Sequence, residues 1–259
     1  MAIDFGPNIS IHGHSAGQLA RVFERQVHGE LLSILMFRTG RAVIRAIEAT
    51  RRHLRIVPWH GHSQNAGESP WDWEAATLRG LDVRDGSGVH RSQWGHGTGR
   101  GSSATVRYNP WDWNVETLPC WDPIAMRTWQ HATGLAPVNP GDETDEVLLH
   151  EMVHALQDMV GRADRRPLGH GFDIVSEFDA IVVVNLQAAE RSRPARLNHQ
   201  QPSVAAASQQ SVIPNTAEFW QRVRNFVSRH RDLAKDLAAV VVDGNPFRDR
   251  RSVFAPAAP

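Results

Sequence analysis

Apolar residues recur at three- and four-residue intervals along much of the chain, and this period predicts a largely helical protein. In the N-terminal part it predicts one helix over residues 16–28 and a second over residues 30–53. The second helix is expected to break near Thr39-Gly40. Residues 1–14 lack the period and are expected to be irregular or strand-like.

Two short strands and three further helices complete the expected elements. The segments 55–59 and 104–108 are predicted strands, and the second of them alternates in polarity. Helices are predicted over residues 145–161, 172–192 and 216–242. The valines of 172–192 favour a strand, but its helical period and its length favour a helix. We therefore expect an α+β fold, predominantly helical, with a small mixed or antiparallel sheet.

The helix predicted over residues 145–161 carries the strongest chemical signal. It contains His150, Glu151 and His154 in the order H-E-x-x-H. Residues four apart lie one turn above each other on a helix, so both imidazoles face one point. Neutral imidazoles suit Zn²⁺ and leave its other positions open. Glu151 lies next to the first histidine, where its carboxylate can act as a base on an attacking water.

The H-E-x-x-H motif is specific enough to support a metal site, since chance produces it in a chain of this length in roughly 4% of cases. Its surroundings strengthen this interpretation. Leu148, Met152 and Leu156 give the helix a buried stripe, and Gly161 is a suitable C-terminal stop. The alternative is a surface helix with two exposed histidines. That alternative fits poorly with the apolar residues on both sides of each histidine.

A catalytic zinc site needs a third protein ligand beside two histidines. The metzincin extension H-x-x-G-x-x-H is absent, because Gln157 and Val160 occupy its glycine and final histidine positions. Other zincins take a glutamate from a following helix, and Glu177 fits this description. His170 and Asp173 are the rival ligands. The alternative role of Glu177 is that of an ordinary glutamate on a helix surface.

Several residues are candidates for supporting the ligands or the substrate. Asp173, Asp179 and Asn185 are candidates to accept the free N–H of a ligand histidine, although an acidic residue near a helix start often caps the helix instead. The strand at 104–108 is a candidate for the sheet edge beside the metal helix along which an extended peptide binds.

Hydrolysis of a peptide bond also requires a donor for the oxyanion that develops on the carbonyl. Tyr108, His199, Arg193 and Arg196 are the candidates. Each is also compatible with an ordinary loop or strand position. We favour Tyr108 and His199 for this role, His199 because such donors often follow the third-ligand helix.

The composition excludes several classes of function. The 28 basic and 28 acidic residues give a formal net charge of zero, so we expect no bulk attraction to nucleic acid or to a membrane surface. No apolar run approaches the length of a membrane span, and the N-terminal sequence lacks the regions of an ordinary signal peptide. Cys120 is the only cysteine, which excludes an internal disulfide framework.

We expect one domain over residues 1–259, with an N-terminal helical part over 1–60. The glycine-rich segment 84–104 is predicted to be a flexible loop and 200–213 a low-complexity connector. Residues 250–259 are predicted to be a loose tail.

The tetrapeptide P-W-D-W occurs twice, at residues 70–73 and 110–113. A repeat of this kind suggests a propeller, but two copies are too few and the flanking segments are helical. We expect two turns whose indoles pack together.

Several of these motifs resemble the NleD-type effector zinc metallopeptidases, which Gram-negative bacteria inject by type III or type VI secretion. The similar segments are YNPWDW, LLHEMVHALQDMVG, SEFDAIVVVN, SRPARLNH and DGNPFRD, in this order. The resemblance implies a zincin-like fold, with His150, His154 and Glu177 as zinc ligands and Glu151 as the base. It also implies delivery by a secretion apparatus, in agreement with the missing signal peptide. The segment 200–213 and the tryptophan-rich first half depart from the family, so its substrates cannot be transferred.

The sequence therefore supports a zinc endopeptidase that acts on a protein of a target cell. As an effector it would be made in the bacterial cytoplasm and injected, and as a toxin against rival bacteria it would have an immunity protein. One alternative is an amidase that acts on cell-wall peptides. Another is a non-catalytic binding or cargo module with a structural zinc ion or none.

Overall fold

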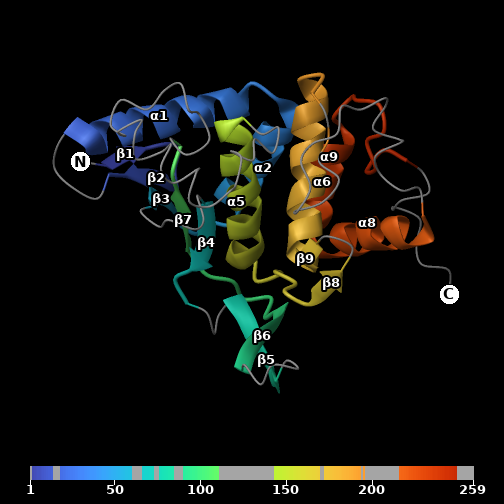
Figure 1. Cartoon of the computed structure of the whole chain (residues 1–259). Coiled ribbons are helices and arrows are strands. Elements are labelled where there is room, and N and C mark those ends of the chain that lie inside the picture. The colour runs from blue at the N-terminus through green and yellow to red at the C-terminus, as the bar shows by residue number, and fades with distance from the viewer. Residues whose placement is uncertain are drawn as a thin grey trace, which may run out of the picture.

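In the computed structural model of the protein, the H-E-x-x-H segment forms a central helix, α5 (Thr144–Met159), between a mixed β-sheet and the helix α6 (Val175–Glu190) (Figure 1). The structure describes residues 2–13, 18–59, 66–72, 76–84, 90–110, 143–169, 172–193, 195 and 216–249. The other helices in these ranges are α1 (Gln18–Leu35), α2 (Arg38–Ala49), α8 (Ala217–Arg229) and α9 (Arg231–Ala238). The α+β prediction is confirmed. None of the helices in these ranges is both long and apolar enough to cross a membrane.

The main sheet has five strands in the order β1-β2-β3-β7-β4. Its members are β1 (Ala2–Asp4), β2 (Ile9–His12), β3 (Leu54–Pro58), β4 (Ala66–Pro70) and β7 (Ala104–Tyr108). The inner strands β2, β3 and β7 are parallel, while β1 and β4 pair antiparallel at the two edges. In β2, β3 and β7 alternate apolar residues are buried, so each of these inner strands contributes one face to the core.

The strand β7 is an inner strand, so the hypothesis that residues 104–108 form a peptide-binding edge is wrong. β4 pairs with the other side of β7 and is the last strand of the described sheet on that side. It also packs against α5. Its sequence, AGESP, shows no alternation of apolar residues, which is why the sequence did not predict this strand.

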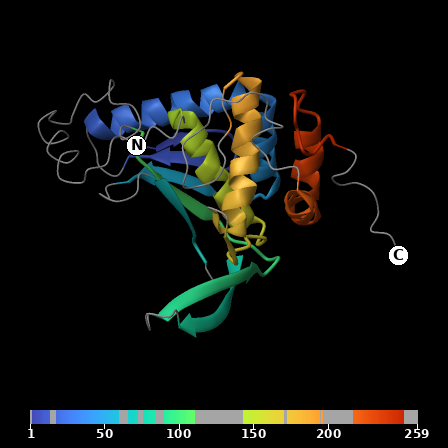
Figure 2. The same cartoon turned by 45° about the vertical axis from the view of Figure 1, so that its right-hand side comes forward.

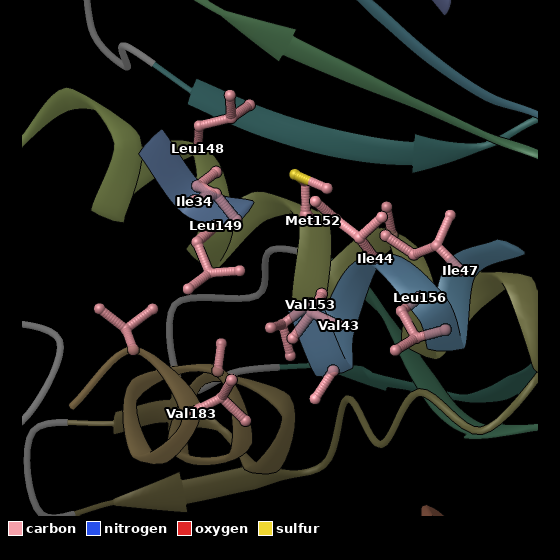
Figure 3. Packing of buried hydrophobic residues seen from close by; sticks show 14 of the residues in the cluster. Ile34, Val43, Ile44, Ile47, Leu148, Leu149, Met152, Val153, Leu156 and Val183 are labelled. Atoms are coloured by element: carbon pink, nitrogen blue, oxygen red, sulfur yellow. The ribbon is translucent and has the colours of Figure 1, made fainter. Parts of the chain in front are cut away.

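The helix α5 is buried on almost all sides. Fourteen of its 16 residues are buried, and only Thr144 and Glu151 keep part of their surface exposed. Figure 3 shows its apolar side chains packed against those of α1, α2 and α6. These side chains are Ile34, Val43, Ile44, Ile47, Leu148, Leu149, Met152, Val153, Leu156 and Val183. Each fully buried side chain of this size stabilises the fold by about 1.5–3 kcal/mol, so α5 is held as a rigid part of the core.

The C-terminal end of α5 has the geometry of a Schellman motif. Gly161 has a positive φ of 65°, and its N–H donates to the carbonyl of Asp158. The N–H of Arg162 donates to the carbonyl of Gln157. This confirms the prediction that Gly161 ends the helix.

The N-terminal helices differ from the predicted ones in their boundaries. α1 continues through the expected gap at 28–30, and the break falls at Met36-Phe37, before Gly40. Gly40 lies in the first turn of α2, where a Cβ would come within 2.1 Å of the carbonyl oxygen of Ile34. The glycine therefore permits the close turn between two helices and does not interrupt the second one.

The glycine-rich segment 84–104 is partly a strand, so the prediction of a flexible loop is wrong for part of it. β6 (His90–Gly97) pairs with β5 (Thr77–Arg84) in a hairpin that projects from the end of α5 in both views (Figures 1 and 2). The glycines allow backbones to touch here: a Cβ on Gly97 would lie 2.0 Å from the carbonyl oxygen of Gly161. Gly97 N–H donates to the carbonyl of Ala163 and Gly99 N–H to that of Gly161.

The two C-terminal helix predictions also need correction. Residues 172–174 form β9 (Phe172–Ile174), which pairs with β8 (Pro167–Gly169) before α6 begins. The predicted helix 216–242 is divided at His230, whose backbone leaves the helical region with φ −126° and ψ 50°. The helix α9 folds back against α2.

Several predictions lie outside the described residues. These are the connector 200–213, the tail 250–259 and the second P-W-D-W copy beyond Pro110. In the first copy the Trp71 indole N–H donates to the hydroxyl of Thr105, and Arg55 stacks on its ring.

Candidate metal centre

The structure brings together the three side chains that the sequence predicted as metal ligands. His150 and His154 extend from the same side of α5, and Glu177 comes from the first turn of α6. The two Nε2 atoms lie 3.0 Å apart, and the Glu177 carboxylate lies 3.0 Å from Nε2 of His150 and 3.3 Å from Nε2 of His154. These side chains form a group that is able to hold a metal ion.

The geometry of the group fits a small divalent cation. Tetrahedral zinc with bonds of ~2.0–2.1 Å places its ligand atoms ~3.3–3.4 Å apart, which is close to the three separations in the group. Two imidazole nitrogens and one carboxylate are also the donor types that zinc accepts. Two nitrogen lone pairs 3.0 Å apart repel each other unless a proton or a cation lies between them. The donor set is therefore suited to a positive charge.

Electrostatics favour the ionised form of Glu177. Burial opposes ionisation, but His154 and His150 overcome this effect and hold the pKa of Glu177 well below its ordinary range. Both histidines are 5% exposed, and the Glu177 side chain is 17% exposed. The group is thus nearly enclosed, and Glu177 is its most exposed member.

Glu151 occupies the accessible side of this otherwise buried helix. It follows His150 directly, and its side chain is half-buried while its neighbours in the same turn are buried. A proton acceptor must be reachable by water and substrate, and Glu151 meets this condition. The position is consistent with the predicted role as a base.

A second set of side chains supports His154. Its Nδ1 lies 3.3 Å from Oε1 of Gln157, one turn further along α5. The Gln157 amide donates to Asp179 on α6 over 3.1 Å, and Arg229 of α8 donates to both Asp179 oxygens over 2.7 and 3.0 Å. Complete burial raises the pKa of Asp179 to about 6, and Arg229 limits the increase. Asp179 was predicted to accept directly from a ligand histidine. It accepts from the amide of Gln157 instead, and the other end of this amide faces His154.

The sequence did not identify Gln157 and Arg229 as supporting residues. The position of Gln157, three residues after His154 on the same helix face, is a signal that was available in the sequence. The sequence contains no comparable signal for Arg229, because only the tertiary fold places α8 beside α6.

Tyr108 does not take the predicted position of an oxyanion donor. Its side chain is fully buried, and its hydroxyl donates to the carbonyl of Thr144 over 2.6 Å at the opposite end of α5 from Gly161. Burial, together with the nearby Glu30 carboxylate, raises the pKa of Tyr108 well above its ordinary value. No substrate can reach this hydroxyl, so the prediction is wrong. The alternation that places Tyr108 on one face with Ala104 and Val106 was the signal for a buried position.

The remaining candidates come from other positions of the fold. Arg193 pairs with Glu143 and Glu146 near the start of α5. Asn185 is buried on α6 two turns beyond Glu177, and Asp173 lies on β9. The predicted residues His170, Arg196 and His199 lie outside the described residues.

Searches with protein-family models, among curated proteins and among solved structures found no match to this chain. The resemblance to NleD-type metallopeptidases therefore stays a prediction from short motifs. What supports a function is the geometry of His150, His154 and Glu177.

Proposed function

We propose that the protein is a zinc-dependent endopeptidase with a zincin-like arrangement of its active site. The observation that carries this proposal is the convergence of His150, His154 and Glu177 beside the half-exposed Glu151. Two histidines and one carboxylate leave one position of a tetrahedral zinc ion open, as in catalytic rather than structural sites.

Zinc bound by these three residues would act as a Lewis acid on the scissile carbonyl and would lower the pKa of a water. Glu151 accepts the proton that this water loses when it attacks the carbonyl carbon. Glu151 then donates the proton to the nitrogen of the leaving amine. The burial of both histidines keeps competing water away from the ligands and fixes their orientation.

The sheet favours a peptide as substrate. β4 is the last strand of the described sheet on the side of α5, and it packs against this helix. An extended peptide can add to such an edge by backbone hydrogen bonds, which would hold it along the strand that packs against the helix of both histidines. On the sequence resemblance alone, we further propose that the protein is an injected effector that cleaves a protein of a target cell.

Metal analysis combined with a cleavage assay tests the proposal. We expect about one zinc ion per wild-type chain, and strongly reduced zinc in Glu177→Gln. Glu151→Gln should keep its zinc and lose cleavage of a mass-spectrometric peptide library by at least about 100-fold, the lower end of a general-base contribution. Glu218→Gln, which changes an exposed carboxylate on α8, is the matched control.

The proposal fails if the wild-type protein binds no divalent metal or if Glu151→Gln cleaves peptides normally. Release of peptides from purified sacculi, without cleavage of the library, would instead identify an amidase. A cobalt-substituted sample with four protein ligands and no activity would identify a structural zinc site.

A further inference from the structure

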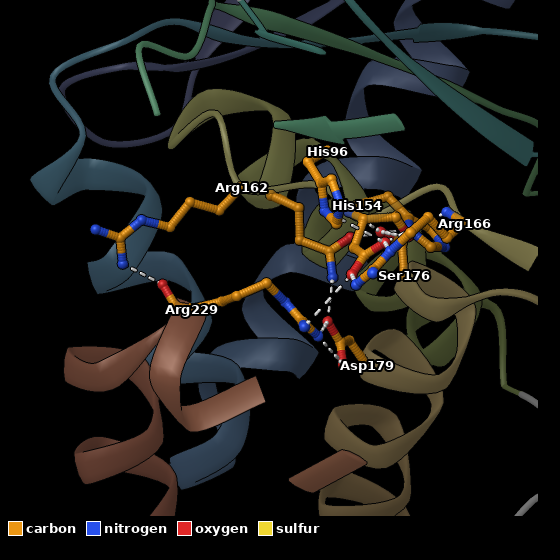
Figure 4. Close-up of polar contacts among 9 residues, drawn as sticks. His96, His154, Arg162, Arg166, Ser176, Asp179 and Arg229 are labelled. Atoms are coloured by element: carbon orange, nitrogen blue, oxygen red, sulfur yellow. Dashed lines mark hydrogen bonds and ion pairs between the residues drawn. The ribbon is translucent and has the colours of Figure 1, made fainter. Parts of the chain in front are cut away.

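A chain of buried polar contacts leads from the C-terminal helix α8 to the metal ligand His154. It passes from Arg229 through Asp179 and Gln157, so it joins α8, α6 and α5. In Figure 4 the side chain of Arg229 points at Asp179, and His154 lies on the other side of the drawn polar contacts. These residues are 50 to 75 positions apart along the sequence, counted from Arg229 back to Asp179 and His154, and only the fold brings them together.

The donor and acceptor groups of these four side chains fix the direction of each hydrogen bond between them. An ionised Asp179 carboxylate can only accept, and both of its oxygens already accept from Arg229. The Gln157 group that faces Asp179 must therefore be its NH₂, which turns its carbonyl oxygen toward His154. The Nδ1 atom of His154 must then carry the proton and donate it to Gln157.

This orientation determines which nitrogen of His154 is available to a metal. A neutral imidazole has one protonated and one unprotonated nitrogen. With the proton held on Nδ1, the lone pair is on Nε2, which is the atom that faces His150 and Glu177. A reversed Gln157 amide would favour the proton on Nε2 and prevent coordination.

These hydrogen bonds have few alternative partners. Asp179 is 0% exposed and Gln157 is 2% exposed, so water cannot readily replace either contact. Arg229 is the last residue of α8 and also lies 3.6 Å from the carboxylate of Asp164. Its carbonyl oxygen accepts from Arg162, just beyond the end of α5. The end of α8 is thereby fastened to both helices of the metal centre.

We propose that Arg229 is a positioning residue of the metal centre, which sets the tautomer of His154 through Asp179 and Gln157 and makes metal affinity depend on the docking of α8. This inference rests on the proposed metal function of the site. Because coupling between two equilibria is reciprocal, bound metal in turn stabilises the docked position of α8.

Zinc affinity, measured by competition with a chelator, tests the proposal in the full chain. Replacing a residue that orients a metal ligand typically weakens metal binding by about 10- to 100-fold. We expect a loss of this size in Arg229→Gln and in Gln157→Met, which keeps the Asp179–Arg229 pair. Arg224→Gln is the matched control, because Arg224 is exposed on α8 and donates to Gln221. Its zinc affinity should equal that of the wild type.

The double variant distinguishes an effect of Arg229 that passes through Gln157 from two independent losses. If Arg229 acts through Gln157, the variant Arg229→Gln/Gln157→Met should bind zinc no more weakly than the weaker single variant. Additive losses would overturn the proposal, as would wild-type affinity in Gln157→Met. Should Arg229→Gln fail to fold, Gln157→Met alone decides the outcome.

Nitrogen NMR of the histidine side chains provides a readout independent of metal. In the metal-free wild type we expect His154 to carry its proton on Nδ1, and in Gln157→Met a mixture of both tautomers. An unchanged tautomer in Gln157→Met would overturn the proposal. Absence of zinc binding in the wild type would instead contradict the metal centre itself, so the two failures are distinguishable.

Discussion

The two ends of α5 carry buried ionic clusters of similar composition and different surroundings. At the N-terminal end, Asp145 and Glu146 pair with Arg191 and Arg193 from the segment that follows α6. At the C-terminal end, the cluster formed by Asp164, Asp179 and Arg229 continues through Gln157 to His154, a candidate metal ligand. Both clusters fasten α5 to α6. Only the second reaches the candidate metal centre in the described structure, so buried charge by itself does not mark a residue as part of that site.

The largest effect should come from breaking the N-terminal cluster. Arg191→Met leaves Asp145 and Glu146 buried without their shared partner, and we expect a loss of about 3–5 kcal/mol in the free energy of unfolding. The zinc affinity of the folded fraction should not change, in contrast to Arg229→Gln. Urea denaturation and chelator competition measure the two quantities. An equal loss of zinc affinity in both variants would remove the distinction between the clusters.

A smaller effect is expected from Glu30, which lies beside Tyr108 at the same end of α5. Burial raises the pKa of Glu30 from 4.5 to about 7, although polar contacts with the side chains of Tyr108 and Thr144 oppose the increase. The native state therefore holds this proton more tightly than the unfolded state, and stability falls as the pH rises from 4.5 to 7. The stability lost by pH 8 is about 3 kcal/mol.

Glu30→Gln removes this titration. Its free energy of unfolding, relative to the wild type, should rise by about 3 kcal/mol between pH 4 and pH 8. Denaturation curves of both proteins at several pH values give the difference. A constant difference over this range would contradict the raised pKa of Glu30.

His230, which joins α8 to α9, should show the opposite pH dependence. Complete burial, assisted by Arg229 and Arg162, lowers its pKa from 6.5 to about 3. The unfolded state then binds the proton more readily, so the stability present above pH 6.5 is lost as the pH falls toward 3. Between pH 8 and pH 5 this amounts to about 2 kcal/mol. In His230→Gln the free energy of unfolding should lose this pH dependence. If acid unfolding of the variant followed the same pH profile as the wild type, the lowered pKa of His230 would be refuted.

The smallest effect should come from the exposed pair between Arg45 and Asp236, which joins α2 to α9. The two side chains are 59% and 46% exposed. Arg45→Gln should change the free energy of unfolding by about 0.5 kcal/mol or less, and the change should disappear in high salt. A loss comparable to that of Arg191→Met would mean that burial is not what separates strong from weak pairs in this protein.

Local rules account for what could be predicted from the sequence. The spacing of His150 and His154, the apolar stripe of α5 and the stop at Gly161 depend on residues within one helix. The position of Glu177 beside the histidines could be predicted because a carboxylate among apolar neighbours needs a partner, and a metal would serve. Each of these signals lies within a few turns of chain.

Predictions failed where the deciding contacts are distant in sequence. Arg229 could not be related to His154, because the relation passes through three helices. β4 and β6 contain glycine, serine and charged residues, so backbone pairing and not apolar alternation makes them strands. Tyr108 was assigned to the correct strand, but its phenolic hydroxyl was given the wrong environment.

Three glycines fasten the β5–β6 hairpin to the core. At Gly97, Gly101 and Gly161 two main chains approach so closely that a single methyl group on any of them would collide with a peptide unit. Natural variants of the protein should therefore accept changes along the two arms of the hairpin more readily than at these three small positions. An alanine scan scored for abundance in cells would then show its largest losses in this region at these three glycines.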